Sequence, residues 1–207
     1  MLSYKRNQVE DAIAKLHESS VVGTELRTRT KRLLDADRTL NVTSGSDDVE
    51  LANFAFFTSS PPGKGGEVQF SEYESFALMI GLQMLGHRWP QGFVVATLRR
   101  LRPALEKEHR KIMKLDPAKV FRPAIGRPKP GTPAIATESA VFLLIWSDQR
   151  SGPNPAPSAE IFGDAQAAFR RTLEKPGRSS TWIELTRPAH LLSQQLSKSL
   201  PRRRGRT

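Results

Sequence analysis

A group of arginine, lysine and threonine side chains is crowded into twelve consecutive positions near the start of the sequence. Its members are Arg27, Thr28, Arg29, Lys31, Arg32 and Arg38. An arginine can donate two hydrogen bonds to O6 and N7 of a guanine in the major groove of DNA, a contact that discriminates between bases by about 1–3 kcal/mol. The remaining cations and hydroxyls can bind phosphate. The pattern predicts a segment that binds double-stranded DNA; the alternative is a solvated helix face whose charge is balanced by nearby carboxylates.

Further cations fall at other places along the chain. Lys5 and Arg6 begin the first expected helix and can contact phosphate, although an ordinary surface position explains them equally well. Lys64 stands in a Gly/Pro-rich turn, where glycines allow the backbone to approach DNA closely. A second group, for which a solvated helix surface is favoured over nucleic-acid binding, consists of Arg99, Arg100, Arg102, Lys107, Arg110, Lys111 and Lys114.

Signals of enzymatic chemistry are weak in this sequence. It has no cysteine, which excludes disulfides, thiolate metal sites and cysteine nucleophiles. Its four histidines are scattered, with no HExxH motif, and no phosphate-binding glycine motif or GxSxG motif is present. We therefore predict neither catalysis nor a cofactor or metal site. No apolar run approaches the roughly 18 residues of a membrane span, and no membrane partner is expected.

The cations must be positioned by helices. Apolar residues at helical spacing predict a first helix over residues 5–17, and Thr24 is expected to cap a second helix that runs to Leu40. Two strand-like runs, 53–58 and 67–70, flank the Gly/Pro-rich turn and predict a β-hairpin with Lys64 at its tip. The phenylalanines of these runs are expected in the core.

The middle of the chain predicts two more helices. Ser71 and Glu74 form a capping box at the start of a helix that is apolar all round and that Gly86 should end. Pro90 can start the next helix, in which Pro103 should cause a kink or a fresh helix start. Leucine-type residues at 3–4 spacing along it predict a dimerisation seam made of Leu98, Leu101, Leu105, Ile112 and Leu115.

The last third of the sequence predicts a linker, a small unit and a tail. Residues 117–137 contain five prolines and no acidic residue, which is typical of a basic extended linker. Residues 138–200 predict a small α/β unit with strands near 140–146 and 181–185. Its helices are expected over 165–174, with Ala168, Phe169 and Leu173 inside, and over 189–200. Residues 201–207 form a basic tail that we expect to be disordered.

The order of a helix, a basic helix and a hairpin over residues 4–115 resembles a winged helix, and the capped and leucine-spaced helices that follow are weakly similar to the MerR-type arrangement. This resemblance implies a DNA-binding domain over 1–74, a helical dimerisation region over 75–116 and a C-terminal effector or partner domain. The predicted fold class is α+β: an N-terminal winged helix, the helical region and the small C-terminal α/β unit.

The net charge of +11 favours a polyanion partner without identifying which one. Together with the resemblance, it leads to the hypothesis of a homodimeric, cytoplasmic and nucleoid-associated transcriptional regulator, bacterial in origin, that reads DNA with the 24–40 helix and braces it with the hairpin wing. One alternative is an architectural protein that binds DNA or RNA with little sequence preference. Another is an interaction or sensor module whose C-terminal unit binds an unknown effector or protein.

Overall fold

The structure is a computed structural model, and it describes residues 3–17, 22–40, 42–43, 46–61, 67–121, 140–147, 158–174 and 179–199. The chain divides into two compact units, of which the first comprises Met1–Pro103 together with Leu191–Thr207 and the second Ala104–His190. The described elements are helices and two small antiparallel sheets, so the protein is of mixed α and β structure. The first unit continues past residue 74 because α4 packs against α2.

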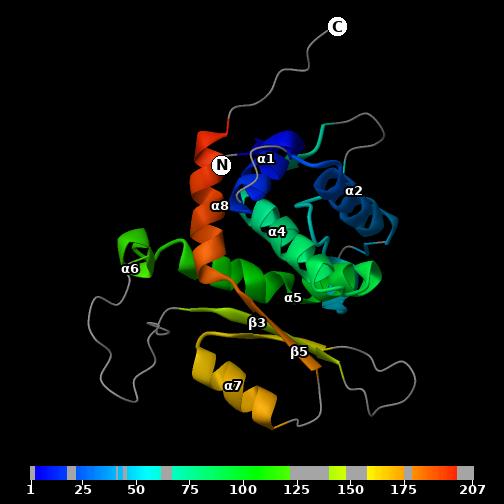
Figure 1. Ribbon diagram of the computed structural model, residues 1–207. Coiled ribbons are helices and arrows are strands. Elements are labelled where there is room, and N and C mark those ends of the chain that lie inside the picture. The colour runs from blue at the N-terminus through cyan, green and yellow to red at the C-terminus, as the bar shows by residue number, and fades with distance from the viewer. Residues whose placement is uncertain are drawn as a thin grey trace, which may run out of the picture. The chain divides into compact units, whose positions relative to one another are not determined.

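Helices form most of the first unit (Figure 1). They are α1 (Arg6–Leu16), α2 (Thr24–Thr39), α3 (Val49–Ala52), α4 (Glu72–Gly86), the first part of α5 (Gln91–Ile112) and the last part of α8 (Thr186–Lys198). The periodic residues Val9, Ala12 and Ile13 are buried, which confirms the first predicted helix. The second predicted helix is also confirmed, but its N-cap is Gly23, without a side-chain hydrogen bond, and Thr24 is its first residue.

The predicted hairpin is wrong. Strand β2 (Gln69–Phe70) pairs antiparallel with β1 (Tyr4–Lys5), with Tyr4 opposite Phe70, and residues 53–58 form no strand. The backbone N–H groups of Ala55 and Phe56 instead donate to the carboxylate of Asp37 in α2. Because those donors are occupied, the segment cannot use them in a β-ladder, and its phenylalanines enter the core as expected.

Helix α4 follows its sequence signals closely at the start. Ser71 accepts a hydrogen bond from the N–H of Glu74, whose side chain accepts in turn from the N–H of Ser71, so the predicted capping box is present. Within the helix, a Cβ at Gly81 would lie 3.2 Å from both Leu33 and Phe56, so glycine allows α2 and α4 to approach closely. At the C-terminus the left-handed residue is Arg88, with φ 66°, and not Gly86.

Helix α5 runs without interruption through Pro103, so of the two predicted alternatives the fresh helix start at this proline is wrong. Three members of the predicted dimerisation seam, Leu98, Leu105 and Ile112, are buried within one chain. This corrects their assignment, since buried side chains offer no free surface to a second copy. Leu101 and Leu115 are half-buried, and the dimer stays a prediction.

The second unit contains a three-stranded antiparallel sheet of order β4-β3-β5, with α7 on one face (Figure 1). Its elements are α6 (Pro117–Phe121), β3 (Phe142–Ser147), β4 (Ser158–Phe162), α7 (Ala165–Leu173) and β5 (Ser179–Glu184). The strands β3 and β5 were predicted; β4, which pairs with β3 from Phe142 opposite Phe162 onwards, was not. Phe169 and Leu173, expected inside, are 56% and 62% exposed, and only Ala168 of the three lies in the core.

Helix α8 begins earlier than predicted, at Thr186 rather than Ala189. The side chain of Glu184 accepts hydrogen bonds from the N–H groups of Thr186 and Arg187, at 2.7 and 3.0 Å, and so caps the first turn. The far end of α8 belongs to the first unit, where the carbonyl of Ser199 accepts from Gln8 Nε2 at 3.0 Å. Most of the predicted linker, the basic tail and Lys64 lie outside the described residues.

Candidate nucleic-acid interface

Helix α2 has two different sides. Arg27, Thr28, Lys31 and Arg32 are exposed, and Arg29 is partly exposed, whereas Thr30, Leu33, Leu34 and Asp37 are buried. The predicted DNA-binding residues therefore lie on the solvent side of a helix whose other side is anchored in the core. We call Arg27, Thr28, Lys31 and Arg32 the α2 face. A helix of this kind fits the major groove of B-DNA, which is about 12 Å wide.

The cations of α2 differ in their local partners. Lys31 Nζ lies 2.8 Å from Asp35 Oδ2, Arg29 pairs with Glu25, and Arg38 lies 3.8 Å from Asp35. These are exposed pairs, and exposed pairs contribute only about 0–1 kcal/mol, so a phosphate can replace the carboxylate at small cost. The side chains of Arg27 and Arg32 have no ion pair within the described part of the chain.

The N-terminus of α2 adds to the positive potential of its exposed cations. The first N–H groups of a helix have no intrahelical partner and carry a partial positive charge that favours anions. At α2 the N-cap is Gly23, and no side chain caps these groups. Glu25 is the one acidic residue of the first turn, and its ion pair with Arg29 compensates its charge.

Two hydrogen bonds hold the backbone of α2 next to its exposed face. Arg6 Nη2 donates to the carbonyl of Arg27 at 3.0 Å, and Gln91 Nε2, from the start of α5, donates to the carbonyl of Arg32 at 3.1 Å. Arg6 also pairs with Glu10 at 2.7 Å, and Lys5 pairs with Glu67 at 2.9 Å. Both predicted phosphate contacts thus have intramolecular partners, and the evident role of Arg6 is to support α2.

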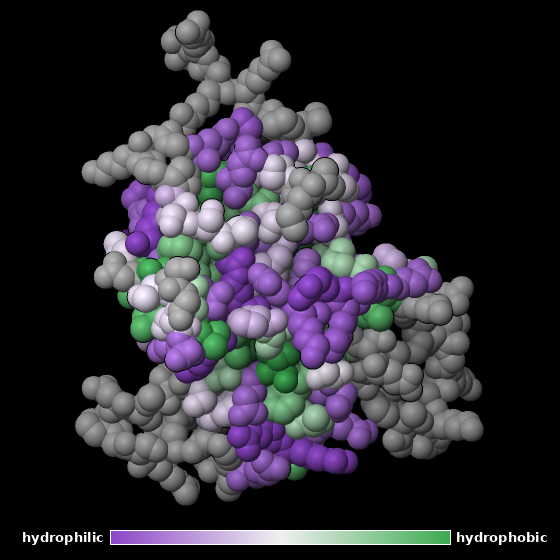
Figure 2. All heavy atoms as spheres, turned by 180° about the vertical axis from the view of Figure 1, so that it is seen from behind, coloured by the Kyte–Doolittle hydropathy of each residue, from purple (hydrophilic) through white to green (hydrophobic). Residues whose placement is uncertain are grey.

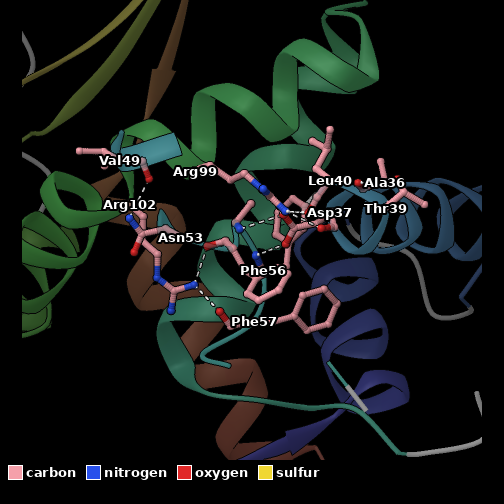
Figure 3. Close-up of polar contacts among 12 residues, drawn as sticks. Ala36, Asp37, Thr39, Leu40, Val49, Asn53, Phe56, Phe57, Arg99 and Arg102 are labelled. Carbon is pink, nitrogen blue, oxygen red and sulfur yellow. Dashed lines mark hydrogen bonds and ion pairs between the residues drawn. The ribbon is translucent and has the colours of Figure 1, made fainter. Parts of the chain in front are cut away.

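A buried ion pair connects the core side of α2 to α5 (Figure 3). Arg99 Nε, from α5, lies 2.7 Å from Asp37 Oδ1, and the two side chains are 1% and 0% exposed. Arg99 also donates to the backbone carbonyls of Asp37 and Leu40. Its placement in a surface basic cluster was therefore wrong: this arginine has partners for its charge and hydrogen bonds inside the core.

Arg102, one turn further along α5, is also buried and ties down the segment that was expected to be a strand (Figure 3). Its Nη1 donates to the carbonyls of Phe54 and Phe57 at 2.7 and 2.6 Å, and its Nη2 lies 3.5 Å from Glu74. The guanidinium also stacks on the ring of Tyr73. Sequence spacing gave no sign of these contacts, because all the partners are distant in sequence.

The corner between α4 and α5 carries one more exposed cation, Arg88, which is not among the residues that the sequence predicted to bind DNA. Arg88 is exposed and has a left-handed backbone, where glycine is the usual residue. Gln91, three residues further on, is the residue that donates to Arg32 in α2. The corner therefore lies close to the α2 face, and it holds an arginine in a conformation that costs about 1–2 kcal/mol.

The described residues show few signs of other chemistry. They contain no group of three or more His, Asp or Glu side chains placed to hold a metal. Burial raises the pKa of Tyr4 and of Glu184, and hydrogen bonds to Glu160 and Glu174 raise the pKa of Arg171.

No known protein family matches the sequence. No curated protein is significantly similar to it either. Within the described residues, no helix has the length and apolar character needed to cross a membrane. On the side of the molecule drawn in Figure 2, hydrophilic side chains predominate, with smaller hydrophobic patches between them.

Proposed function

We propose that the protein binds double-stranded DNA by placing the α2 face in the major groove. The observation that carries this proposal is the two-sided character of α2: exposed cations on one side, and on the other a core anchored by Leu33, Leu34 and the Asp37–Arg99 pair. A rigid helix loses little conformational entropy on binding, and Arg27 and Arg32 need break no ion pair with the described residues.

The proposed biological role is that of a transcriptional regulator. The resemblance to winged helices gives this role little support, because the described part of the predicted wing forms no hairpin. The DNA-binding proposal is supported instead by the α2 face and by Arg88. A regulator must prefer one sequence over others, whereas the architectural alternative requires equal affinity for all duplexes.

Selection of random duplex DNA by the purified full-length protein tests both roles. Enrichment of one sequence supports a regulator, and a two-fold symmetric sequence supports a dimer. Enrichment of no sequence, with binding at low salt, favours the architectural alternative. Failure to retain any duplex at low salt contradicts the proposal and leaves the interaction module.

Point variants test the α2 face itself. Loss of one base contact worth about 1–3 kcal/mol lowers affinity about 5- to 150-fold, so Arg27→Ala and Arg32→Ala should each weaken binding to the selected site within this range. Arg170→Ala, which removes an exposed arginine from α7, is the matched control and should bind as the wild type does. Wild-type affinity in both α2 variants would show that α2 is not the reading helix.

A further inference from the structure

We propose that the second unit pairs with the same unit of another copy of this chain, through the outer edge of strand β4 and the exposed side of helix α7. We call this surface the β4–α7 edge, and it consists of Ser158–Phe162 and the side chains of Phe169 and Leu173. All of it belongs to the second unit. The inference goes beyond the proposed function, because the contact is between proteins and needs no DNA.

Strand β4 has a free side. In the sheet of order β4-β3-β5 it is an outermost strand, and it pairs with β3 from Trp146 opposite Ser158 to Phe142 opposite Phe162. No other strand among the described residues pairs with it. An outer strand presents N–H and C=O groups that another strand can bind, and natural edges are commonly protected by proline, lysine or a bulge. The sequence of β4, Ser-Ala-Glu-Ile-Phe, contains neither proline nor lysine.

Helix α7 exposes a pair of apolar side chains. Phe169 and Leu173 are 56% and 62% exposed, which are the highest values among the large apolar side chains of the described residues. The two residues are four positions apart, so they are neighbours on one side of the helix. Ala168 is buried and faces the sheet instead. An apolar pair at helical spacing is typical of a helix side that packs against another element.

This apolar pair lies beside the free side of β4. Arg171 is two positions from both Phe169 and Leu173, which places it about 160° away from each of them around the helix. The Arg171 guanidinium stacks on the ring of Trp146 in β3, 5.6 Å from its centroid. Since α7 contacts β3 and β4, the side that carries Arg171 is directed towards β3. The side with Phe169 and Leu173 is therefore directed away from β3, past the outer edge of β4.

A two-fold axis at this surface matches it to itself. Antiparallel pairing of β4 with β4 of a second copy joins the two sheets into one and satisfies both free edges. The same rotation brings the two α7 helices together, so that Phe169 and Leu173 of each copy are buried against those of the other. A strand from an unrelated protein would have to supply both a β-edge and apolar side chains in the same places. A second copy supplies both, which makes it the favoured occupant.

The charges of this surface do not oppose such pairing. Glu160 is the one charged residue in the sequence of β4, and Arg171 Nη2 lies 2.8 Å from its carboxylate. Arg171 also pairs with Glu174, at 3.2 Å. Like charges directly opposite one another destabilise a pair of strands, but each Glu160 brings its own counter-ion. Together with the exposed Arg170, these two glutamates and two arginines have no net charge, so two copies do not repel each other.

The size of the surface predicts a weak dimer. Each copy contributes one strand of five residues and two large apolar side chains. Complete burial of a phenylalanine covers only about 150–250 Å², so the total area is well below the roughly 1,600 Å² of a standard interface. Interfaces under about 1,200 Å² belong to weak or transient complexes. We therefore expect the dimer to dissociate on dilution through roughly the micromolar range.

Sedimentation velocity of the full-length protein without DNA, from about 1 to 100 μM, tests the proposal. The α7 variant carries Phe169→Ser and Leu173→Ser. The matched control carries Val49→Ser and Leu51→Ser, which remove two exposed apolar side chains from α3 in the first unit. Hydrogen–deuterium exchange at the lowest and highest concentrations reports on the backbone N–H groups of β4, and thermal melting shows whether each variant folds.

We expect the wild type and the control to pass from monomer to dimer over this range, and the α7 variant to need at least about ten-fold higher concentration. In the wild type, the N–H groups of β4 should exchange more slowly at the highest concentration. A wild type that remains monomeric overturns the proposal, as does an α7 variant that dimerises normally or a dimer without added protection of β4. Because no DNA is present, the result is independent of the α2 face.

Discussion

Arg99 and Asp37 form an ion pair that is closed off from solvent, with Arg99 Nε 2.7 Å from Asp37 Oδ1. The Asp37 carboxylate also accepts the backbone N–H groups of Ala55 and Phe56, at 3.1 and 2.9 Å. One carboxylate thus connects α2, α5 and the segment between α3 and β2. Since α2 carries the proposed DNA-binding face, the pair positions that face without touching DNA.

The first prediction compares this buried ion pair with an exposed ion pair of similar N–O distance on the same helix. Asp37→Ala removes the counter-ion of a buried guanidinium and the acceptor of two buried N–H groups, and removal of one partner of a buried pair costs about 3–5 kcal/mol. Lys31→Ala removes the exposed pair with Asp35, at 2.8 Å, and should cost less than about 1 kcal/mol. Urea unfolding followed by circular dichroism measures both values.

Arg99→Met provides the internal check on that prediction. It removes the cation but leaves Asp37 bonded to two N–H groups, so it should destabilise the protein less than Asp37→Ala does. Equal and small effects of Asp37→Ala and Lys31→Ala on the free energy of unfolding would show that the buried pair does not hold α2 in place.

The second prediction concerns the left-handed residue at the corner between α4 and α5. Arg88→Gly removes the steric cost of a side chain at φ 66°. It should raise the free energy of unfolding by up to about 1 kcal/mol, because glycine loses more conformational entropy on folding and this offsets part of the gain. The same variant should weaken binding to the selected DNA, because it removes an exposed cation next to the α2 face. Urea unfolding and anisotropy titrations measure the two changes.

Arg88→Lys is the control for that corner, since it keeps both the charge and the strained backbone, and it should resemble the wild type in stability. If Arg88→Gly gains stability and binds DNA with unchanged affinity, the strain at this position has no connection with DNA binding.

The third prediction concerns pH. Partial burial raises the pKa of Glu184 above its usual value, although the N–H groups of Thr186 and Arg187 act in the opposite direction. The folded state therefore binds this proton more tightly than the unfolded state. The resulting stabilisation is fully present below the unfolded pKa, which is about 4.3, and is lost as the pH rises through the raised folded pKa.

Glu184→Gln removes this titration and keeps an oxygen that can accept from Thr186. The stability of the wild type relative to the variant should therefore fall as the pH increases from about 4 to 7, as measured by urea unfolding at each pH. A difference that stays constant over this interval, or that grows in favour of the wild type, would contradict the raised pKa.

Several features of the fold could be predicted because their causes are local. Helix α1 follows from the spacing of Val9, Ala12 and Ile13, and the start of α4 from the Ser71–Glu74 capping box, whose partners are three residues apart. Strands β3 and β5 follow from short apolar runs. The exposed cations of α2 were also identified from their spacing, since one face of an amphipathic helix has to remain in solvent.

The errors share a different cause, which is that burial and strand pairing depend on segments far apart in the chain. Arg99 and Arg102 belonged by sequence to a basic surface, yet acceptors contributed by Asp37, Phe54 and Phe57 allow both to be buried. The composition of the run 53–58 suits a strand, but the N–H groups of Ala55 and Phe56 donate to the carboxylate of Asp37 and not to a neighbouring strand. Local composition thus specified where helices begin and which residues carry charge, while long-range packing assigned each charge to the core or to the surface, because a buried charge is stable only when distant partners satisfy it.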